Sequence, residues 1–230
     1  MRRNLDELDG RRLLTGGPVV LVSTSYRGRH NVMPVAYSMV LSLVPPLIGI
    51  AVHPDRYSTD VIRKTNEFAL NIPSRDLLHH VQYLGSLSGA DFDKMELTKL
   101  PTFRARLLNA PLLEGCIGWV ECALEDMVEM GDHLLCVGRV VAASADDDAF
   151  DDHWLLKTPD MKPLHYLGGN HYAMLDYVMD ARVPKSAEEY GKRLDEAVAE
   201  QLELTKDAAE QRSEEDYERD EFRRREGFDT

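Results

Sequence analysis

Arg56, Ser58 and Thr59 stand just before a short apolar segment, and together they have the chemistry of an anion site. Residues 61–64 are predicted to form a short helix with Ser58 at or near its N-cap. A phosphomonoester needs hydrogen-bond donors and positive potential. A guanidinium, a hydroxyl and the free amides of a helix N-terminus supply both. The alternative is that Ser58 only caps the helix and Arg56 is a surface charge.

Sequence motifs for other kinds of chemistry are absent. No G-x-G-x-x-G follows a predicted strand, and the sequence has no G-x-x-x-x-G-K, H-E-x-x-H or G-x-S-x-G. A Rossmann unit, a P-loop and an acyl-transferring serine are therefore not expected. The eight histidines include His79 next to His80, and His165 near His171, but no spacing directs two imidazoles to one metal. We expect no metal site.

The three cysteines, Cys116, Cys122 and Cys136, lie in or beside apolar runs and lack C-x-x-C spacing. Buried structural thiols are the preferred interpretation.

The charge of the chain argues against nucleic acid and anionic membranes as partners. The formal net charge is -13. Residues 185–230 contain nine Lys or Arg and sixteen Asp or Glu, so this segment contributes -7 and the rest -6. Binding to phosphate backbones requires a basic face, and none is visible.

The length of 230 residues predicts one substantial domain, at 1–184, with an acidic helical extension at 185–230. No stretch approaches the ~20 apolar residues of a membrane span, and the first residues do not lead into an apolar signal core. A cytoplasmic protein is expected.

Short β-branched and apolar runs dominate the chain. Strands are predicted at 18–24, 30–36, 47–52, 68–72, 116–124 and 133–143. The first two should form a hairpin through a turn at 26–29. Pro45 and Pro46 mark the entrance of the third, and acidic turn residues should end the strand 116–124. Residues 85–111 are expected to be loop-rich.

Helical patterns are few. A second short helix is predicted from 73 to 83, and an amphipathic helix from 186 to 202, opened by the capping box of Ser186 and Glu189. The charged stretch beyond it should be frayed, and docking on the protein's own dimer is preferred to partner recruitment. A mainly β fold with short helices, either a barrel or a sandwich, is predicted.

Several segments, taken in order between residues 17 and 172, resemble the flavin reductase and flavoredoxin family. They are 31–37 (Asn-Val-Met-Pro-Val-Ala-Tyr), 42–46 (Ser-Leu-Val-Pro-Pro), 56–58 with Ile62, 66–73 (Asn-Glu-Phe-Ala-Leu-Asn-Ile-Pro), 85–89 (Gly-Ser-Leu-Ser-Gly) with 93–94, 131–133 (Gly-Asp-His) with Gly138, and 166–169 (Tyr-Leu-Gly-Gly). The resemblance implies an FMN-binding split β-barrel with the flavin at a homodimer interface.

The resemblance also implies roles for single residues. Asn31 and the backbone of 33–36 would meet the flavin ring and ribityl chain, and Tyr37 stands where the family often has Trp. Ser58 stands where the family usually has Thr. Lys94 would reach the cofactor, and His133 would approach the ring to donate a hydrogen bond or assist proton delivery. The implied cofactor-binding set is Asn31, Met33, Pro34, Val35, Ala36, Tyr37, Ala51, Arg56, Ser58, Thr59, Asn71, Ser88, Lys94, His133 and Tyr166.

Plainer interpretations remain open for these residues: a hairpin position for Asn31, a core aromatic for Tyr37, a loop charge for Lys94 and a structural histidine for His133. A tight turn would account for Tyr166 and the two glycines that follow Leu167.

The function implied by the resemblance is that of an FMN-dependent oxidoreductase. Electrons would pass from NADH or NADPH through bound FMN to free flavin, ferric iron or a partner protein, with His133 as the catalytic side chain. One alternative is a flavoredoxin-like carrier without direct nicotinamide activity, which the acidic tail mildly favours. A pyridoxamine-phosphate-oxidase-like enzyme is disfavoured by the segments around Asn31 and Gly131.

Overall fold

The computed structural model describes residues 2, 4–179, 186, 191–192, 194–196, 198–200 and 203. The chain divides into two units, residues 1–178 and 179–230. Residues 191–192, 194–196, 198–200 and 203 are helical. Ser186 is described as well. The other residues of the helix predicted at 186–202, and the charged stretch that follows it, lie outside the described residues. The domain boundary predicted after residue 184 stays a prediction.

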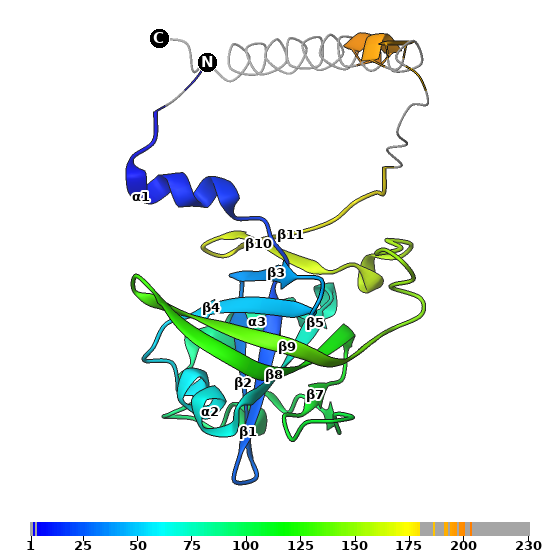
Figure 1. The fold of residues 1–230 in the computed structure, drawn as a ribbon. Helices are drawn as coiled ribbons and strands as arrows, with labels where there is room; N and C mark the ends of the chain where they lie inside the picture. Colours follow the sequence, from blue (N-terminus) through cyan, green and yellow to red (C-terminus); the bar gives the residue numbers. More distant parts are fainter. Residues whose placement is uncertain are drawn as a thin grey trace, which may run out of the picture. The chain divides into compact units, whose positions relative to one another are not determined.

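A seven-stranded antiparallel sheet forms the centre of the first unit (Figure 1). In order across the sheet, the strands are β2 (Arg29–Val35), β1 (Val20–Tyr26), β5 (Glu67–Pro73), β8 (Cys116–Met130), β9 (His133–Ala145), β4 (Leu47–Val52) and β3 (Ser38–Ser42). Among the described residues, β2 and β3 are its two edges, so hydrogen bonds do not close the sheet into a barrel. The predicted mainly β fold with short helices is confirmed.

Short elements surround the sheet. Two small hairpins pair β6 (Thr102–Phe103) with β7 (Leu112–Leu113) and β10 (Leu164–Gly168) with β11 (His171–Met174). The helices are α1 (Glu7–Gly10), α2 (Tyr57–Thr65), α3 (Leu78–Ser86) and α4 (Lys94–Thr98), with 3-10 turns η1 (Arg11–Leu14), η2 (Arg75–Leu77) and η3 (Pro159–Met161). Within the described part of the chain, every helix is too short or too polar to cross a bilayer.

The predicted first hairpin is confirmed. β1 and β2 pair from Val20 with Val35 to Tyr26 with Arg29. Arg27 and Gly28 form the two-residue turn with φ of 52° and 78°. Two positive φ values give the backbone twist that suits a tight hairpin.

The predicted end of the strand 116–124 is wrong, because β8 continues to Met130. Glu125 and Asp126 are exposed strand residues and not a turn, and the register shifts between Leu124 and Asp126. Glu125 Oε2 also accepts a hydrogen bond from Arg139 Nε at 3.1 Å, across to β9. The turn falls instead at Gly131, which has a φ of 63°.

Several short elements are absent from the sequence-based prediction, and β3 and α4 are among them. β3 follows β2 directly and forms an edge of the sheet, where it pairs only with β4 among the described strands. α4 lies in the region expected to be loop-rich. Asp93 caps it by accepting hydrogen bonds from the amides of Met95 and Glu96, both at 3.0 Å.

The core under the sheet is built around Phe68, which is fully buried together with Ile50 and Ile62. The prediction of buried thiols is confirmed: Cys116, Cys122 and Cys136 are free and buried. Burial raises the pKa of Cys116 and of Cys122 to about 12.

Gly138 of β9 is where the core tolerates least change. A Cβ at this position would lie 2.5 Å from Phe68 Cζ and 2.8 Å from Cys122 Cβ. We expect Gly138→Val to lower the free energy of unfolding by about 3 kcal/mol or more, since overpacking forces core side chains and backbone to shift. Urea unfolding measures the change. Gly17→Ala is the matched control, because no described residue beyond its chain neighbours lies within 4 Å of a Cβ there; equal losses in the two variants would contradict the packing account.

Candidate functional site

A cleft of about 430 Å³ opens between the sheet, α3 and the β10–β11 hairpin. Residues 33–37 supply one wall as the chain leaves β2, and the end of β4 supplies another with Ala51, Val52 and His53. Val81 and Gly85 face it from α3, and the remaining lining comes from Val19, Arg56, Gln82, Ser86, His133, Tyr166, Gly169 and Tyr172. We call it the central cleft. It combines apolar walls with a few polar groups, as small-molecule sites do.

A smaller pocket of about 120 Å³ adjoins the central cleft at the N-terminus of α2. The two cavities share Met33, Pro34, Arg56 and Gly85, so they form one groove. The rest of this side pocket is lined by Asp55, Tyr57, Ser58, Leu84, Leu87, Ser88, Gly89 and Lys94. Two cations, one carboxylate, two serine hydroxyls and a helix N-terminus therefore meet at one end of the groove.

Lys94 is the most unusual charge in the side pocket, because only 4% of the residue is exposed. Its Nζ donates to Val32 O at 3.1 Å and to Leu84 O at 2.8 Å. Burial, and then the nearby Arg56, lower the pKa of Lys94 to about 8. An ammonium has three donors, so one is left for a ligand in the pocket that Lys94 lines.

Ser58 lies in the first turn of α2, near the N-cap as expected from the sequence; the N-cap itself is Arg56, with extended backbone. The helix begins earlier, and the Ser58 hydroxyl accepts a hydrogen bond from Asn31 Nδ2 at 2.8 Å. Asn31 Oδ1 is buried and has no hydrogen-bond partner among the described residues. It lies against Gly89, so Asn31 and Ser58 hold the helix start next to the loop of Gly89.

Arg29 fixes that loop from the other side. Its Nη2 donates to Gly89 O at 2.8 Å and to Phe92 O at 3.0 Å, and the guanidinium lies 5.2 Å from the centre of the Tyr57 ring. Because Gly89 and Tyr57 both line the side pocket, Arg29 positions the pocket wall without lining it.

His133 enters the central cleft at the start of β9. Its ring centre lies 5.9 Å from that of Tyr37 and 5.9 Å from that of His53. Its Nδ1 is 2.7 Å from Asp132 Oδ1, and this hydrogen bond holds the pKa of the exposed Asp132 carboxyl below its usual value. In the described residues, no three His, Cys, Asp or Glu side chains gather as a metal site would require.

Most of the residues singled out from the sequence line the groove. In the central cleft these are Met33, Pro34, Val35, Ala36, Tyr37, Ala51, Arg56, His133 and Tyr166, and in the side pocket Ser58, Ser88 and Lys94, with Arg56 again.

Three of the residues singled out do not line the groove. Asn31 lies behind Ser58. Thr59 is fully buried, with Oγ1 donating to His53 O at 3.0 Å. Asn71 lies in the core, where its Nδ2 donates to Leu21 O and Ser23 Oγ and its Oδ1 accepts from the Leu113 amide at 2.8 Å. All three support the fold around the groove.

Sequence reasoning missed other groove residues, among them Asp55, Gln82, Tyr172 and His53. The Tyr172 hydroxyl donates to Gln82 Oε1 at 2.7 Å and so joins β11 to α3 across the cleft. Only the polar position of Gln82 on the predicted helix 73–83 could have indicated it. His53 directly follows the predicted strand 47–52, and its position at a strand end was the available clue.

The part of the chain that forms the groove is similar to known proteins. The model of the flavin reductase like domain matches residues 11–174. The chain belongs to the flavin reductase like family. An uncharacterized protein from Escherichia coli, YddH, is 30% identical over 166 residues, which cover 70% of this chain and 88% of YddH.

The family match spans every residue that lines the central cleft and the side pocket. A crystal structure of an FMN-binding protein from Thermus thermophilus is similar, with a TM-score of 0.68 and 28% identity; the match covers 79% of this chain and 99% of that one. A flavin reductase from Pseudomonas putida is 30% identical over 115 residues, covering 49% of this chain and 63% of that protein. The groove thus lies in the part of the chain that defines the flavin reductase like family.

Gly89 gives the side pocket of this flavin reductase like domain a testable weak point. A Cβ at Gly89 would collide with Asn31 Oδ1 and lie 2.8 Å from the Tyr57 ring. We expect Gly89→Ala to weaken binding of a phosphorylated ligand by about tenfold, because the pocket wall must shift. Isothermal titration with FMN measures the change. Gly10→Ala is the control, since a Cβ there would have open space around it in the described part of the chain; unchanged affinity in Gly89→Ala would contradict the role of this close contact.

Proposed function

We propose that the groove binds FMN and that the protein is an FMN-dependent oxidoreductase fed by NADH or NADPH. The observation that carries the proposal is the joining of a small cationic pocket to a larger, mostly apolar cleft. FMN has the same division, a phosphate at one end and a flat ring at the other. The open sheet is then the FMN-binding split-barrel scaffold, and the predicted cytoplasmic location stays a prediction.

The side pocket fits a phosphate. Arg56 and Lys94 supply positive charge, Ser58 and Ser88 supply hydroxyls, and the N-cap of α2 makes no side-chain capping bond to the described residues. Charge-assisted hydrogen bonds of this kind are about twice as strong as neutral ones. Phosphate binding also explains why the chain keeps Lys94 buried although burial lowers its pKa.

The central cleft fits the ring. Residues 34–36 present backbone and small side chains along one wall, and Tyr37, Tyr166 and Tyr172 add aromatic surface. Bound FMN would supply the redox chemistry, accepting hydride from a nicotinamide and passing electrons to free flavin, ferric iron or a partner protein. The protein binds and orients both partners.

His133 is the proposed catalytic side chain. Asp132 engages its Nδ1 at 2.7 Å, which leaves Nε2 to exchange a proton with a ligand in the cleft. Tyr37 and His53 flank the imidazole and hold it at the cleft wall.

A second copy of the chain is proposed to cover the edge strand β3. Val40, Leu43 and Val44 are 70%, 83% and 92% exposed on β3 and the turn after it, and Met39 is 50% exposed. Such a contiguous apolar patch on a sheet edge marks an interface. Because Tyr37 precedes β3 and lines the cleft, the second copy would lie next to the flavin. The homodimer is therefore proposed as the functional form.

The test of the proposed function is anaerobic reduction. The purified protein, loaded with FMN, should lose its visible flavin absorption when NADH or NADPH is added, and oxygen should restore it. A yellow protein that neither nucleotide bleaches would instead support a flavoredoxin-like carrier. A chain that binds no FMN would contradict both.

Lys94 makes FMN binding depend on pH. In the free chain its pKa is about 8, and a bound phosphate would raise that pKa because it stabilises the ammonium. Affinity is thus full below pH 8 and falls as Lys94 loses its proton, so the Kd should rise about tenfold from pH 7 to pH 9. Flavin fluorescence titrations measure it. Lys94→Arg stays charged and should show a flat profile; a flat profile in the unaltered protein would contradict the assignment.

A further inference from the structure

A third cavity, of about 470 Å³, adjoins the central cleft at the end away from the side pocket. Its polar lining comes from Arg11 and Arg12 of η1, Thr15, and His171 of β11. We call it the arginine pocket. Among the described residues, none lines both this pocket and the side pocket.

The arginine pocket opens into the central cleft through a shared wall. Tyr37, Tyr166 and Gly169 line both cavities. Arg11 Nη1 donates to the Tyr37 hydroxyl at 3.4 Å, which brings a guanidinium to the boundary between them. A ligand can therefore extend from the cleft into the arginine pocket.

The segment that carries the two arginines is tied to the β10–β11 hairpin. Thr15 Oγ1 donates to Arg12 O at 2.7 Å and to Leu167 O at 3.3 Å, and His165 Nδ1 lies 2.7 Å from Gly16 O. Tyr166 N donates to Gly17 O at 3.2 Å. These contacts connect η1 to the β10–β11 hairpin, so hydrogen bonds hold the two sides of the arginine pocket together.

Two glycines of the hairpin leave backbone open to a ligand. Gly168 and Gly169 have φ of 117° and 57°, which glycine adopts without strain. Within the described part of the chain, a Cβ at Gly168 would meet no atom within 4 Å, and a Cβ at Gly169 would meet only His171 Nδ1, at 3.8 Å. Backbone at these two lining positions is therefore open to close approach by a phosphate-bearing ligand.

The charge of the arginine pocket contrasts with the protein as a whole. The chain has a net charge of -13, yet the described residues that line this cavity include two guanidiniums and no carboxylate. Asp9 pairs with Arg12 at 3.2 Å, but both side chains are largely exposed, at 42% and 67%. Exposed pairs of this kind are weak, so a ligand anion can displace Asp9.

We propose that the arginine pocket binds the diphosphate of the nicotinamide dinucleotide whose nicotinamide ring enters the central cleft. This inference rests on the proposed function and adds to it the binding site of the electron donor. A diphosphate carries two negative charges, and guanidiniums bind phosphate oxygens in pairs of hydrogen bonds. The central cleft then adjoins two cationic pockets, the side pocket for the phosphate of FMN and the arginine pocket for the diphosphate of the nicotinamide dinucleotide.

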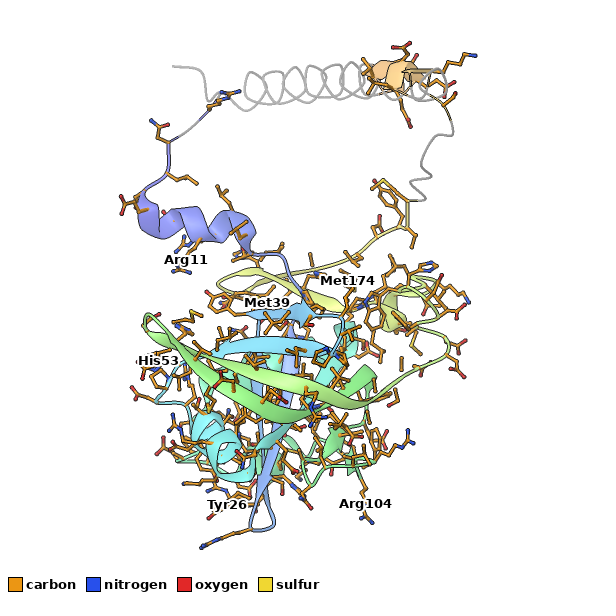
Figure 2. The ribbon with its side chains drawn as sticks, viewed as in Figure 1. Arg11, Tyr26, Met39, His53, Arg104 and Met174 are labelled. Carbon is orange, nitrogen blue, oxygen red and sulfur yellow. The ribbon has the colours of Figure 1, made fainter. Side chains whose placement is uncertain are left out.

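The test uses ADP-ribose, which keeps the diphosphate and lacks the nicotinamide. Isothermal titration of ADP-ribose into the FMN-loaded chain should show binding. Arg12→Gln should weaken it by about tenfold and Arg11→Gln with Arg12→Gln by more, because charge-assisted hydrogen bonds are lost. Arg104→Gln is the matched control, since Arg104 is exposed at the opposite end of the sheet domain from Arg11 (Figure 2).

The outcomes separate this inference from the proposed function. Loss of ADP-ribose affinity in the arginine variants, with FMN affinity kept in Arg12→Gln, supports the arginine pocket. Absence of ADP-ribose binding, or equal binding in Arg12→Gln and Arg104→Gln, overturns it even if NADH bleaches the flavin. If neither nucleotide bleaches the flavin, the proposed function fails, while the titration still reports on the pocket.

Discussion

Lys94→Met is expected to raise the Kd for FMN by a factor of about a hundred, because a charge-assisted hydrogen bond contributes about 1.5–3 kcal/mol. Lys94 is buried in the side pocket, and water cannot replace its charge there as it could at the surface. Turnover with NADH should fall with flavin occupancy at limiting FMN. Fluorescence titration of FMN measures the affinity directly.

The control for Lys94→Met is Lys157→Met, which removes an exposed lysine outside the groove. Since Lys94 also donates to the carbonyls of Val32 and Leu84, urea unfolding of the variant checks that the domain still folds. A folded Lys94→Met protein with unaltered FMN affinity would remove Lys94 from the phosphate site.

Val40→Glu combined with Val44→Glu is expected to convert the proposed dimer into a monomer. The two side chains are 70% and 92% exposed in the single chain. Burying two unpaired carboxylates at the interface should weaken dimerisation by about a thousandfold or more. FMN affinity should fall as well, because Tyr37 and β3 are adjacent in the chain. Analytical ultracentrifugation and FMN titration read the two effects separately.

Leu107→Glu is the matched control for the dimer variant, because Leu107 is 60% exposed and lies outside β3. It should leave the molecular mass unchanged. A double variant that still sediments as a dimer, or an unaltered protein that is monomeric when loaded with FMN, would contradict an interface at β3.

Local sequence patterns predicted the elements that are determined by residues close together in the chain. The hairpin of β1 and β2 followed from a polar turn between β-branched runs, with Arg27 and Gly28 at its tip. The end of β8 could not be predicted, because Glu125 and Asp126 resemble a turn in sequence and remain in the strand through pairing with β9. A local sequence pattern cannot predict an interaction between residues 14 positions apart, such as Glu125 and Arg139.

The residues of the candidate site also divide into those that the sequence predicted and those whose role depends on contacts distant in the chain. Arg56, Ser58 and Lys94 were predicted through donor chemistry and family resemblance, and all three line the side pocket. Arg29 was missed because its contacts, the carbonyls of Gly89 and Phe92, come from a loop about 60 residues away. Asn71 was chosen for its place in a family segment, but its amide satisfies backbone groups in the core.

The side pocket is proposed to recognise the phosphate of a flavin whose ring occupies the central cleft, and the other assignments depend on this recognition. Parallel titrations of the flavin-free protein with FMN and with riboflavin test it most directly, since the two ligands differ only in that phosphate. We expect FMN to bind at one molecule per chain and riboflavin to bind at least about a hundredfold more weakly. Equal affinities for the two, or no binding of FMN, would contradict the account.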